Sequence, residues 1–190
     1  NSRAQEGKNE FNRLTFVLLG VTTPTDLIKN PVRSPFNIGN PIFLSDFSKE
    51  DAQVLQEHLE AVFPNQGQVI FDHIYRWTNG HPYLTQKLCL GVVQEADRQW
   101  SDKRVIEGWI KELFQKTGPE KDDNIKWVEN FILAHEQRDE LLLLYKKICK
   151  ERTVLDEGQS IIHNQLKLSG LVKEKNGELH PRNRIYELLF

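Results

Sequence analysis

The sequence predicts a mixed α/β chain, in which the remnant of a parallel β-sheet precedes a mostly helical part that ends in a winged helix. Three observations lead to this fold class: an apolar run of strand length near the start, a series of apolar stripes at helical spacing, and a hairpin signal near the end. From them we expect three segments, with boundaries at residues 1–66, 67–138 and 139–190.

The first segment contains one clear strand. Residues 14–21 (LTFVLLGV) are apolar throughout, without alternation, which is typical of a strand buried on both faces of a parallel sheet. Residues 41–44 (PIFL) are the other nearby candidate. Between them, residues 22–41 contain four prolines and predict an ordered loop, with a short helix over 25–29. Two strands do not complete a sheet, so we expect the rest of it to lie outside this chain.

Amphipathic helices are predicted through residues 48–133, because apolar side chains recur there at spacings of three and four. The first opens at Ser48, whose hydroxyl can cap a helix with an acidic first turn. The others cover residues 68–77, a stretch from Pro82 onward, and residues 103–114 and 124–133. The apolar stripes, in chain order, are Ala52, Leu55, Leu59 and Val62; Ile70, Ile74 and Trp77; Leu84, Leu88 and Val92; Val105, Trp109, Ile110 and Leu113; and Trp127, Val128 and Phe131.

A stiff joint separates two of these helices, in the stretch WTNGHPYLTQKLC. Asn79 and Gly80 are the residues expected in the left-handed conformation that ends a helix. Pro82 pre-sets the first turn of the next helix, where its missing N–H costs nothing. The joint therefore fixes an angle between two helices, and spacing alone favours a corner that binds no ligand.

The last segment predicts a winged helix. Helices are expected over residues 139–150 and 159–168, followed by two short arms around Asn176-Gly177, the strongest local signal for a β-hairpin. The closing residues, NRIYELLF, return an apolar end to the core.

Composition excludes several classes of protein. With 25 Lys and Arg against 27 Asp and Glu, the formal charge is −2, which indicates neither nucleic acid nor an anionic membrane as a partner. No run approaches the roughly 18 apolar residues of a membrane span. Cys89 and Cys149 lie in apolar helical patterns, so we expect packed, reduced thiols and a cytoplasmic location. The absence of methionine and the start at Asn1 predict a piece of a longer protein.

Taken in order, LTFVLLGVTTPTDLI, SPFNIGNPIFLSDFS, WTNGHPYLTQKLC and SGLVKEKNGELHPRNRIYELLF resemble the AAA-like domain family of the STAND (signal transduction ATPases with numerous domains) class of P-loop NTPases. The resemblance covers nearly the whole chain and matches the second half of such proteins. It implies that residues 1–66 are the end of the P-loop NTPase sheet with its sensor strand. Residues 67–138 would then be the helical lid, and residues 139–190 the winged helix.

The resemblance also implies nucleotide-facing residues. Thr22 and Thr23 stand where a side chain could sense the terminal phosphate of ATP. Gly80 and Pro82 match the family's G-x-P motif, whose proline packs near the adenine or ribose. His180 lies where related proteins carry a histidine near the phosphates, although the surrounding LHPR is not their usual motif. For the two threonines, hydrogen bonding at the strand end or helix capping ahead of Pro24 stays an alternative.

The chain departs from the family in one decisive respect. No G-x-x-x-x-G-K-[ST] phosphate loop occurs, and no apolar strand ends in paired acids that could hold Mg²⁺. We therefore expect no ATP hydrolysis by this chain alone, and ATP or ADP, with Mg²⁺, to be bound only together with the missing N-terminal half. The resemblance implies that half, other domains of the parent protein and oligomerisation as its partners, in a nucleotide-controlled switch.

Two other functions remain open. The winged helix could bind nucleic acid, but residues 139–190 hold nine Lys and Arg against eight Asp and Glu, and the presumed recognition stretch QSIIHNQLKLSG offers one lysine. Alternatively, the chain could be an adaptor that supplies only an interface. Neither a metal site nor a catalytic constellation is recognisable by spacing.

Overall fold

The computed structural model describes residues 44–116, 121–151 and 154–190, together with Val17. The chain divides into two compact units, Asn1–Leu44 and Ser45–Phe190. The predicted strands at 14–21 and 41–44 lie outside the described residues except for Val17 and Leu44. These two have no regular structure and are 75% and 88% exposed, so they do not show the burial expected of strand residues.

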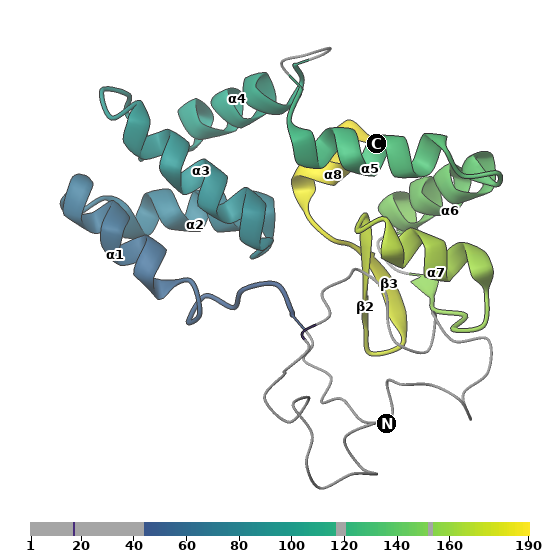
Figure 1. Cartoon of the computed structure of the whole chain (residues 1–190). Helices are drawn as coiled ribbons and strands as arrows, with labels where there is room; N and C mark the ends of the chain where they lie inside the picture. Colours follow the sequence, from purple (N-terminus) through teal and green to yellow (C-terminus); the bar gives the residue numbers. More distant parts are fainter. Residues whose placement is uncertain (1–16, 18–43, 117–120, 152–153) are drawn as a thin grey trace, which may run out of the picture. The chain divides into compact units, whose positions relative to one another are not determined.

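The second unit is mostly helical with a small antiparallel sheet, and Figure 1 labels its elements in order. Helix α1 spans Gln53–Val62 and begins later than predicted. Ser48 Oγ accepts from the Asp51 N–H at 3.1 Å, and the Asp51 carboxylate accepts from the Ser48 N–H at 3.0 Å. These two bonds close a turn before the helix, in place of a cap on it. Val62, predicted in the buried stripe, is 43% exposed.

The next three helices follow the predicted stripes closely. They are α2 (Gly67–Thr78), α3 (Pro82–Gln94) and α4 (Lys103–Phe114). Every predicted stripe residue of α2 and α3 is buried, and α2 packs against both α1 and α3. In α4 the buried stripe runs through Ile106, Trp109, Ile110 and Phe114, one residue out of step with the prediction at each end.

Two further helices, α5 (Asp123–Leu133) and α6 (Arg138–Glu151), pack on each other. The predicted buried stripe of α5 is confirmed at Val128 but not at Trp127. Ile125, Val128 and Ile132 are buried, whereas Trp127 is 44% exposed and stacks on Phe131 with ring centroids 5.5 Å apart.

The sheet has the strand order β1-β3-β2 and is antiparallel throughout. Its members are β1 (Val154–Leu155), β2 (Val172–Lys175) and β3 (Glu178–Pro181), with α7 (Ile161–Leu168) between β1 and β2 and α8 (Arg184–Leu189) after β3. The predicted hairpin is confirmed: Lys175 pairs with Glu178 across Asn176 and Gly177, whose φ angles are 57° and 80°. Positive φ at both positions is the requirement of a two-residue type I′ turn.

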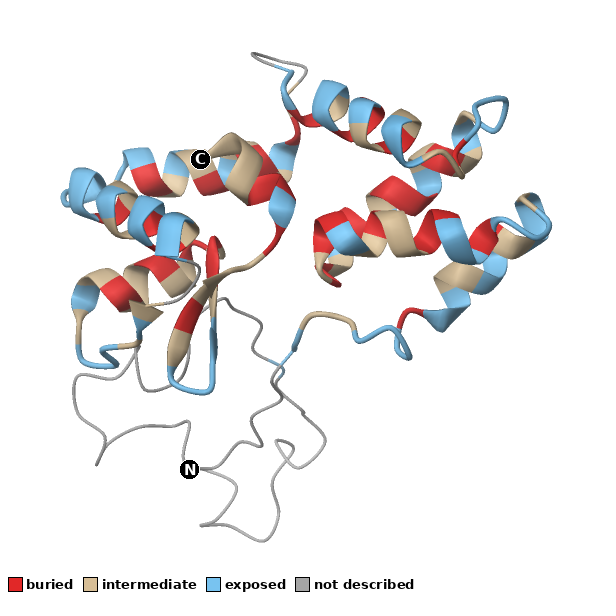
Figure 2. Ribbon diagram, turned by 180° about the vertical axis from the view of Figure 1, so that it is seen from behind, coloured by how far each residue is buried: buried red, intermediate tan, exposed pale blue. Residues whose placement is uncertain are grey.

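Buried apolar side chains form one continuous cluster through the second unit, and Figure 2 shows their red segments alternating with exposed blue ones along the helices. Cys89 is buried and Cys149 half-buried, and neither is in a disulfide, as predicted. Burial raises the pKa of the Cys89 thiol to about 12. Across the described residues, no helix has both the length and the apolar composition needed to cross a bilayer.

Candidate functional site

The candidate site is built around the joint between α2 and α3. Asn79 ends α2 in the left-handed conformation, with φ at 50°, and its N–H donates to the Tyr75 carbonyl at 2.7 Å. Gly80 follows with φ at 79°. His81 then caps α3, and Pro82 takes its first position. Both predicted roles, a left-handed helix end and a proline helix start, are confirmed.

A second stretch of backbone crosses this joint. The N–H of Phe47 donates to the Gly80 carbonyl at 2.8 Å, and the Tyr75 hydroxyl donates to the Phe47 carbonyl at 2.9 Å. A methyl group on Gly80 would lie 2.0 Å from that Phe47 carbonyl oxygen, so the crossing leaves no room for a side chain. The joint is thereby tied to the segment that leads into α1.

The joint is also bonded to the end of the hairpin. The Asn79 side-chain amide donates to the Arg182 carbonyl at 2.9 Å, although the two residues are 103 positions apart. The Arg182 guanidinium in turn donates to Asp46, with its Nη2 at 2.8 Å and its Nε at 3.2 Å from Oδ1. A carboxylate held by two donors of one guanidinium is a strong and directional pair.

His81 lies at the centre of a buried polar chain that reaches α5 and α8. Its Nδ1 accepts from the Leu84 N–H at 3.4 Å, so its Nε2 carries the proton and donates to the Tyr186 oxygen at 3.2 Å. The Tyr186 hydroxyl donates to the Asn124 side-chain oxygen at 2.8 Å. Burial, followed by the nearby charge of Arg182, lowers the pKa of His81 to about 4. The imidazole is therefore neutral at physiological pH.

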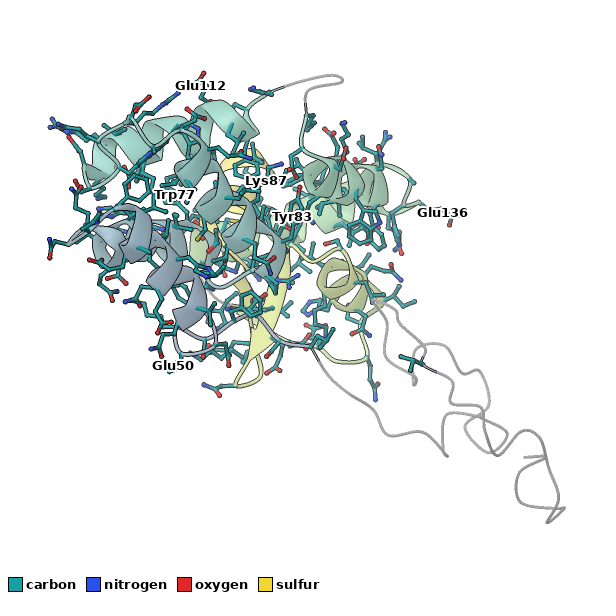
Figure 3. The ribbon with its side chains drawn as sticks, turned by 60° about the vertical axis from the view of Figure 1, so that its left-hand side comes forward. Glu50, Trp77, Tyr83, Lys87, Glu112 and Glu136 are labelled. Atoms are coloured by element: carbon teal, nitrogen blue, oxygen red, sulfur yellow. The ribbon has the colours of Figure 1, made fainter. Side chains whose placement is uncertain are left out.

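Asp122 connects the start of α5 to the first turns of α3, where Figure 3 labels Tyr83 and Lys87. Its Oδ1 caps α5 by accepting from the Asn124 and Ile125 N–H groups at 2.9 and 3.1 Å. Its Oδ2 accepts from the Tyr83 hydroxyl at 2.8 Å and lies 2.7 Å from Lys87 Nζ. Burial alone would raise the pKa of Asp122, but these hydrogen bonds outweigh it and keep the pKa below its usual value.

We call these contacts between residues 44–116 and residues 121–190 the polar seam. Its members are the pairs Asp46–Arg182, Asp46–Lys173, Asn79–Arg182, His81–Tyr186, Tyr83–Asp122 and Lys87–Asp122. Each pair is a hydrogen bond or an ion pair. In each, the partner from residues 44–116 lies in the loop before α1, at the joint or in the first turns of α3. The two groups of helices are thus linked through directional polar contacts close to the joint.

The outer face of the hairpin is basic. Val172 and Leu179 point into the core and are buried, so the alternate residues of β2 and β3 face outward. Lys173 pairs across the ladder with His180, and Arg182 follows two positions after His180. On this face His180 Nε2 lies 3.6 Å from the Glu178 carboxylate, and Lys173 Nζ lies 3.8 Å from Asp46.

The predicted site residues are distributed as follows. Thr22 and Thr23 lie outside the described residues. Gly80 and Pro82 form the joint, and His180 lies on β3, two positions before the residue that the joint binds. Among the described residues, no hydrogen bond or ion pair joins His180 to the joint itself. A pocket of about 400 Å³ among α4, α5, α6 and α8 is lined by none of the predicted residues.

Sequence reasoning missed Asp46, His81, Tyr186 and Asp122. Asp46 and Arg182 are 136 positions apart, and no local pattern connects them. Asp122 carries the one signal that could have been found, an aspartate at the cap position two residues before Asn124. Within the described parts of the chain, no three His, Cys, Asp or Glu side chains group closely enough to hold a metal ion.

Comparison with known proteins identifies the family of this chain. The model of the AAA-like domain family matches residues 2–190, which is nearly the whole chain. The chain belongs to the AAA-like domain family. The resemblance carried by the joint and the closing hairpin is confirmed at the level of the family.

One curated relative of this AAA-like domain is an uncharacterized WD repeat-containing protein of Synechocystis sp. It is 34% identical over 199 residues, a match that includes 100% of this chain. The chain spans only 16% of the length of that relative. No solved structure matches the chain.

Proposed function

We propose that this chain is the regulatory part, comprising the sensor strand, lid and winged helix, of a STAND-like switch controlled by ATP and ADP. Its membership of the AAA-like domain family and the much greater length of its WD repeat-containing relative support a module that works within a larger protein. In this proposal, α2–α5 are the lid, and α6 to α8 with the three-stranded sheet are the winged helix. The phosphate loop and the Mg²⁺ ligands come from the missing N-terminal half.

The observation that carries the proposal is the bond from Asn79, at the joint, to the carbonyl of Arg182, at the end of the hairpin. It couples the G-x-P motif of the lid directly to the winged helix. Interfaces between domains that move relative to one another are more polar than permanent ones. The seam pairs Asn79–Arg182 and His81–Tyr186, which join the lid to the winged helix, have that character, so a change in lid angle can be transmitted or released through these hydrogen bonds.

The chemistry of the hairpin fits the phosphates of a nucleotide. Lys173, Lys175 and Arg182 are three cations on or next to its outer face, and His180 stands among them. Cations and imidazole N–H groups are the side chains that bind phosphate oxygens. Gly80 and Pro82 would lie near the adenine or ribose, and Thr22 and Thr23 would face the terminal phosphate. The exchange of ATP for ADP would then expose or hide surfaces for partner domains or for oligomerisation.

Nucleic-acid binding is the weaker alternative for the winged helix. In α7, the presumed recognition helix, Lys167 Nζ lies 2.6 Å from the Asp156 carboxylate, so its charge is already neutralised. Ile161, at the start of α7, is 66% exposed and offers no contact to phosphate. A titration of duplex binding with salt tests this alternative, because phosphate contacts produce a steep loss of affinity as salt rises.

The proposal is tested by thermal unfolding of the longer protein that contains this chain, with and without ADP or ATP. Nucleotide should raise the melting temperature, and Pro82→Ala should reduce that rise, because the start of α3 within the lid is no longer pre-set. Pro64→Ala, in the exposed connection between α1 and α2, is the matched control and should leave the rise unchanged. The absence of any nucleotide response would refute the proposal and favour an adaptor.

A further inference from the structure

We infer that Asp46 is an internal substitute for a phosphate group: its carboxylate occupies an anion site formed by Arg182 and Lys173, and a phosphate-bearing ligand displaces it. The inference rests on the proposed function only for the source of the phosphate. The site itself follows from the three side chains and their surroundings.

The charges at this site do not balance. Asp46 accepts hydrogen bonds from two nitrogens of Arg182, Nε and Nη2, whereas Lys173 Nζ stands at 3.8 Å, beyond hydrogen-bonding distance. One carboxylate therefore faces two cations. Glu178, the other acid of the outer face, lies against His180 and not against Lys173. A phosphate carries close to two negative charges at neutral pH and can bond both cations at once.

The site is also partly withdrawn from water, which strengthens its preference for an anion. The side chains of Asp46, Arg182 and Lys173 are 14%, 27% and 34% exposed. Burial lowers the pKa of Lys173, and Arg182 and Lys175 add to that effect against the opposing influence of Asp46. The Lys173 ammonium group thus has too little negative charge around it, because it shares the Asp46 carboxylate with Arg182.

The backbone that carries the two cations is held in place by hydrogen bonds. The Arg182 N–H donates to the Leu171 carbonyl at 2.9 Å, and the Arg182 carbonyl accepts from Asn79. Lys173 belongs to the β2–β3 ladder. Asp46, by contrast, lies in a stretch without regular structure, anchored through its neighbour Phe47. Rotation of the Asp46 side chain alone would free both cations, and the bonds of Phe47 to the joint would remain.

Anion binding at Arg182 and the contact of Asp46 with the hairpin therefore exclude each other. When Asp46 holds Arg182, the chain just after residue 44 is clasped to the hairpin. When phosphate holds Arg182, the clasp is released. Phosphate must displace the Asp46 carboxylate before it can bind, so its apparent affinity is reduced by the strength of the internal pair. Removal of the carboxylate should therefore raise the affinity for phosphate.

The test measures binding of inorganic phosphate to the 190-residue chain by calorimetry at constant ionic strength. Asp46→Asn should bind phosphate about tenfold more tightly than wild type, a change that corresponds to about 1.4 kcal/mol. Lys173→Gln should weaken phosphate binding both in the chain that keeps Asp46 and in Asp46→Asn. Asp97→Asn, an equal charge change at an exposed position between α3 and α4, should have no effect.

A second measurement keeps the test valid if Asp46→Asn folds poorly. In wild type, phosphate should shift the NMR resonances of the Asp46 and Arg182 side chains, while the Phe47 amide keeps its protection from exchange through its bond to Gly80. Equal phosphate affinity in wild type and Asp46→Asn, or no effect of Lys173→Gln, would overturn the inference. Phosphate and ADP binding without adenosine binding would identify the phosphate group as the ligand. Phosphate binding here without any nucleotide response of the longer protein would refute the proposed function and leave this site standing.

Discussion

The carbonyl oxygen of Phe47 lies where a side chain on Gly80 would begin. A Cβ atom built on Gly80 falls 2.0 Å from that oxygen, while the Phe47 N–H donates to the Gly80 carbonyl at 2.8 Å. Gly80 also has φ at 79°, a conformation that other residues adopt with strain. Glycine is therefore required at this position for two independent reasons, the backbone conformation and the close crossing.

Gly80→Ala should destabilise the chain by about 3 kcal/mol or more, because the cost of the left-handed conformation adds to that of displacing the Phe47 backbone. Gly177→Ala is the matched control. Gly177 has φ at 80°, but a Cβ there would meet nothing within 4 Å. Gly177→Ala should therefore reduce the stability only by the cost of the left-handed conformation, about 1 kcal/mol. Urea unfolding of both variants checks this, and equal losses would show that the crossing is not tight.

Pro82→Gly should loosen the two helices that meet at the joint, because it frees φ at the first position of α3. Amide hydrogen exchange across residues 70–92 should rise, with a smaller rise in Pro82→Ala. If exchange in this range is unchanged by Pro82→Gly, the proline does not stiffen the joint.

Acid should destabilise the chain through His81. Its pKa is about 4 in the folded chain and about 6.5 when unfolded, so the unfolded state binds the proton more readily. The stability from neutral His81 is complete above about pH 6.5 and is lost as the pH falls toward 4. Between pH 7.5 and pH 5, wild type should lose about 2 kcal/mol more than His81→Asn, which keeps a capping side chain but does not titrate. Equal pH profiles would mean that His81 is not buried neutral.

Asp122→Ala should cost about 3 kcal/mol, because it removes a helix cap and leaves Lys87 and Tyr83 without their shared acceptor. The neighbouring Asp123 offers the control. Its side chain is 92% exposed and pairs with Lys126, so Asp123→Ala should cost less than about 0.5 kcal/mol. Chemical denaturation measures the free energy of unfolding of the two variants. Equal small losses would show that Asp122 does not anchor the polar seam.

The 190-residue chain should release no phosphate from ATP, because it lacks the backbone and lysine that hold the β- and γ-phosphates. A sensitive phosphate assay against a heat-treated sample checks this. Hydrolysis above that background would require a phosphate site that the sequence does not reveal.

Local chemistry made the joint and the hairpin predictable. Asn79, Gly80 and Pro82 act through their own backbone preferences, and Asn176-Gly177 requires only its immediate neighbours. The stripes of α2 and α3 were also predictable, because their apolar residues repeat at one clear helical spacing. In each case the signal and the structure lie within the same few residues.

Tertiary context decided the rest. In α5 two apolar faces compete, and packing on α6 buries Ile125, Val128 and Ile132 in preference to Trp127. The strand β1 has two residues and exists only because β3 pairs with it. The polar seam could not be predicted from spacing, because its residues come from distant parts of the chain, among them Asp46, Arg182 and Tyr186.

The central claim is that nucleotide shifts the lid against the winged helix across the Asn79–Arg182 and His81–Tyr186 pairs of the polar seam. The most direct measurement is the distance between spin labels at Glu112, which Figure 3 labels on α4, and at Lys175 at the hairpin tip, in the longer protein that we propose to supply the phosphate loop. Labels introduced through unnatural amino acids leave Cys89 and Cys149 intact. We predict distinct distance distributions with ATP and with ADP, and a single unchanged distribution in both would contradict the claim.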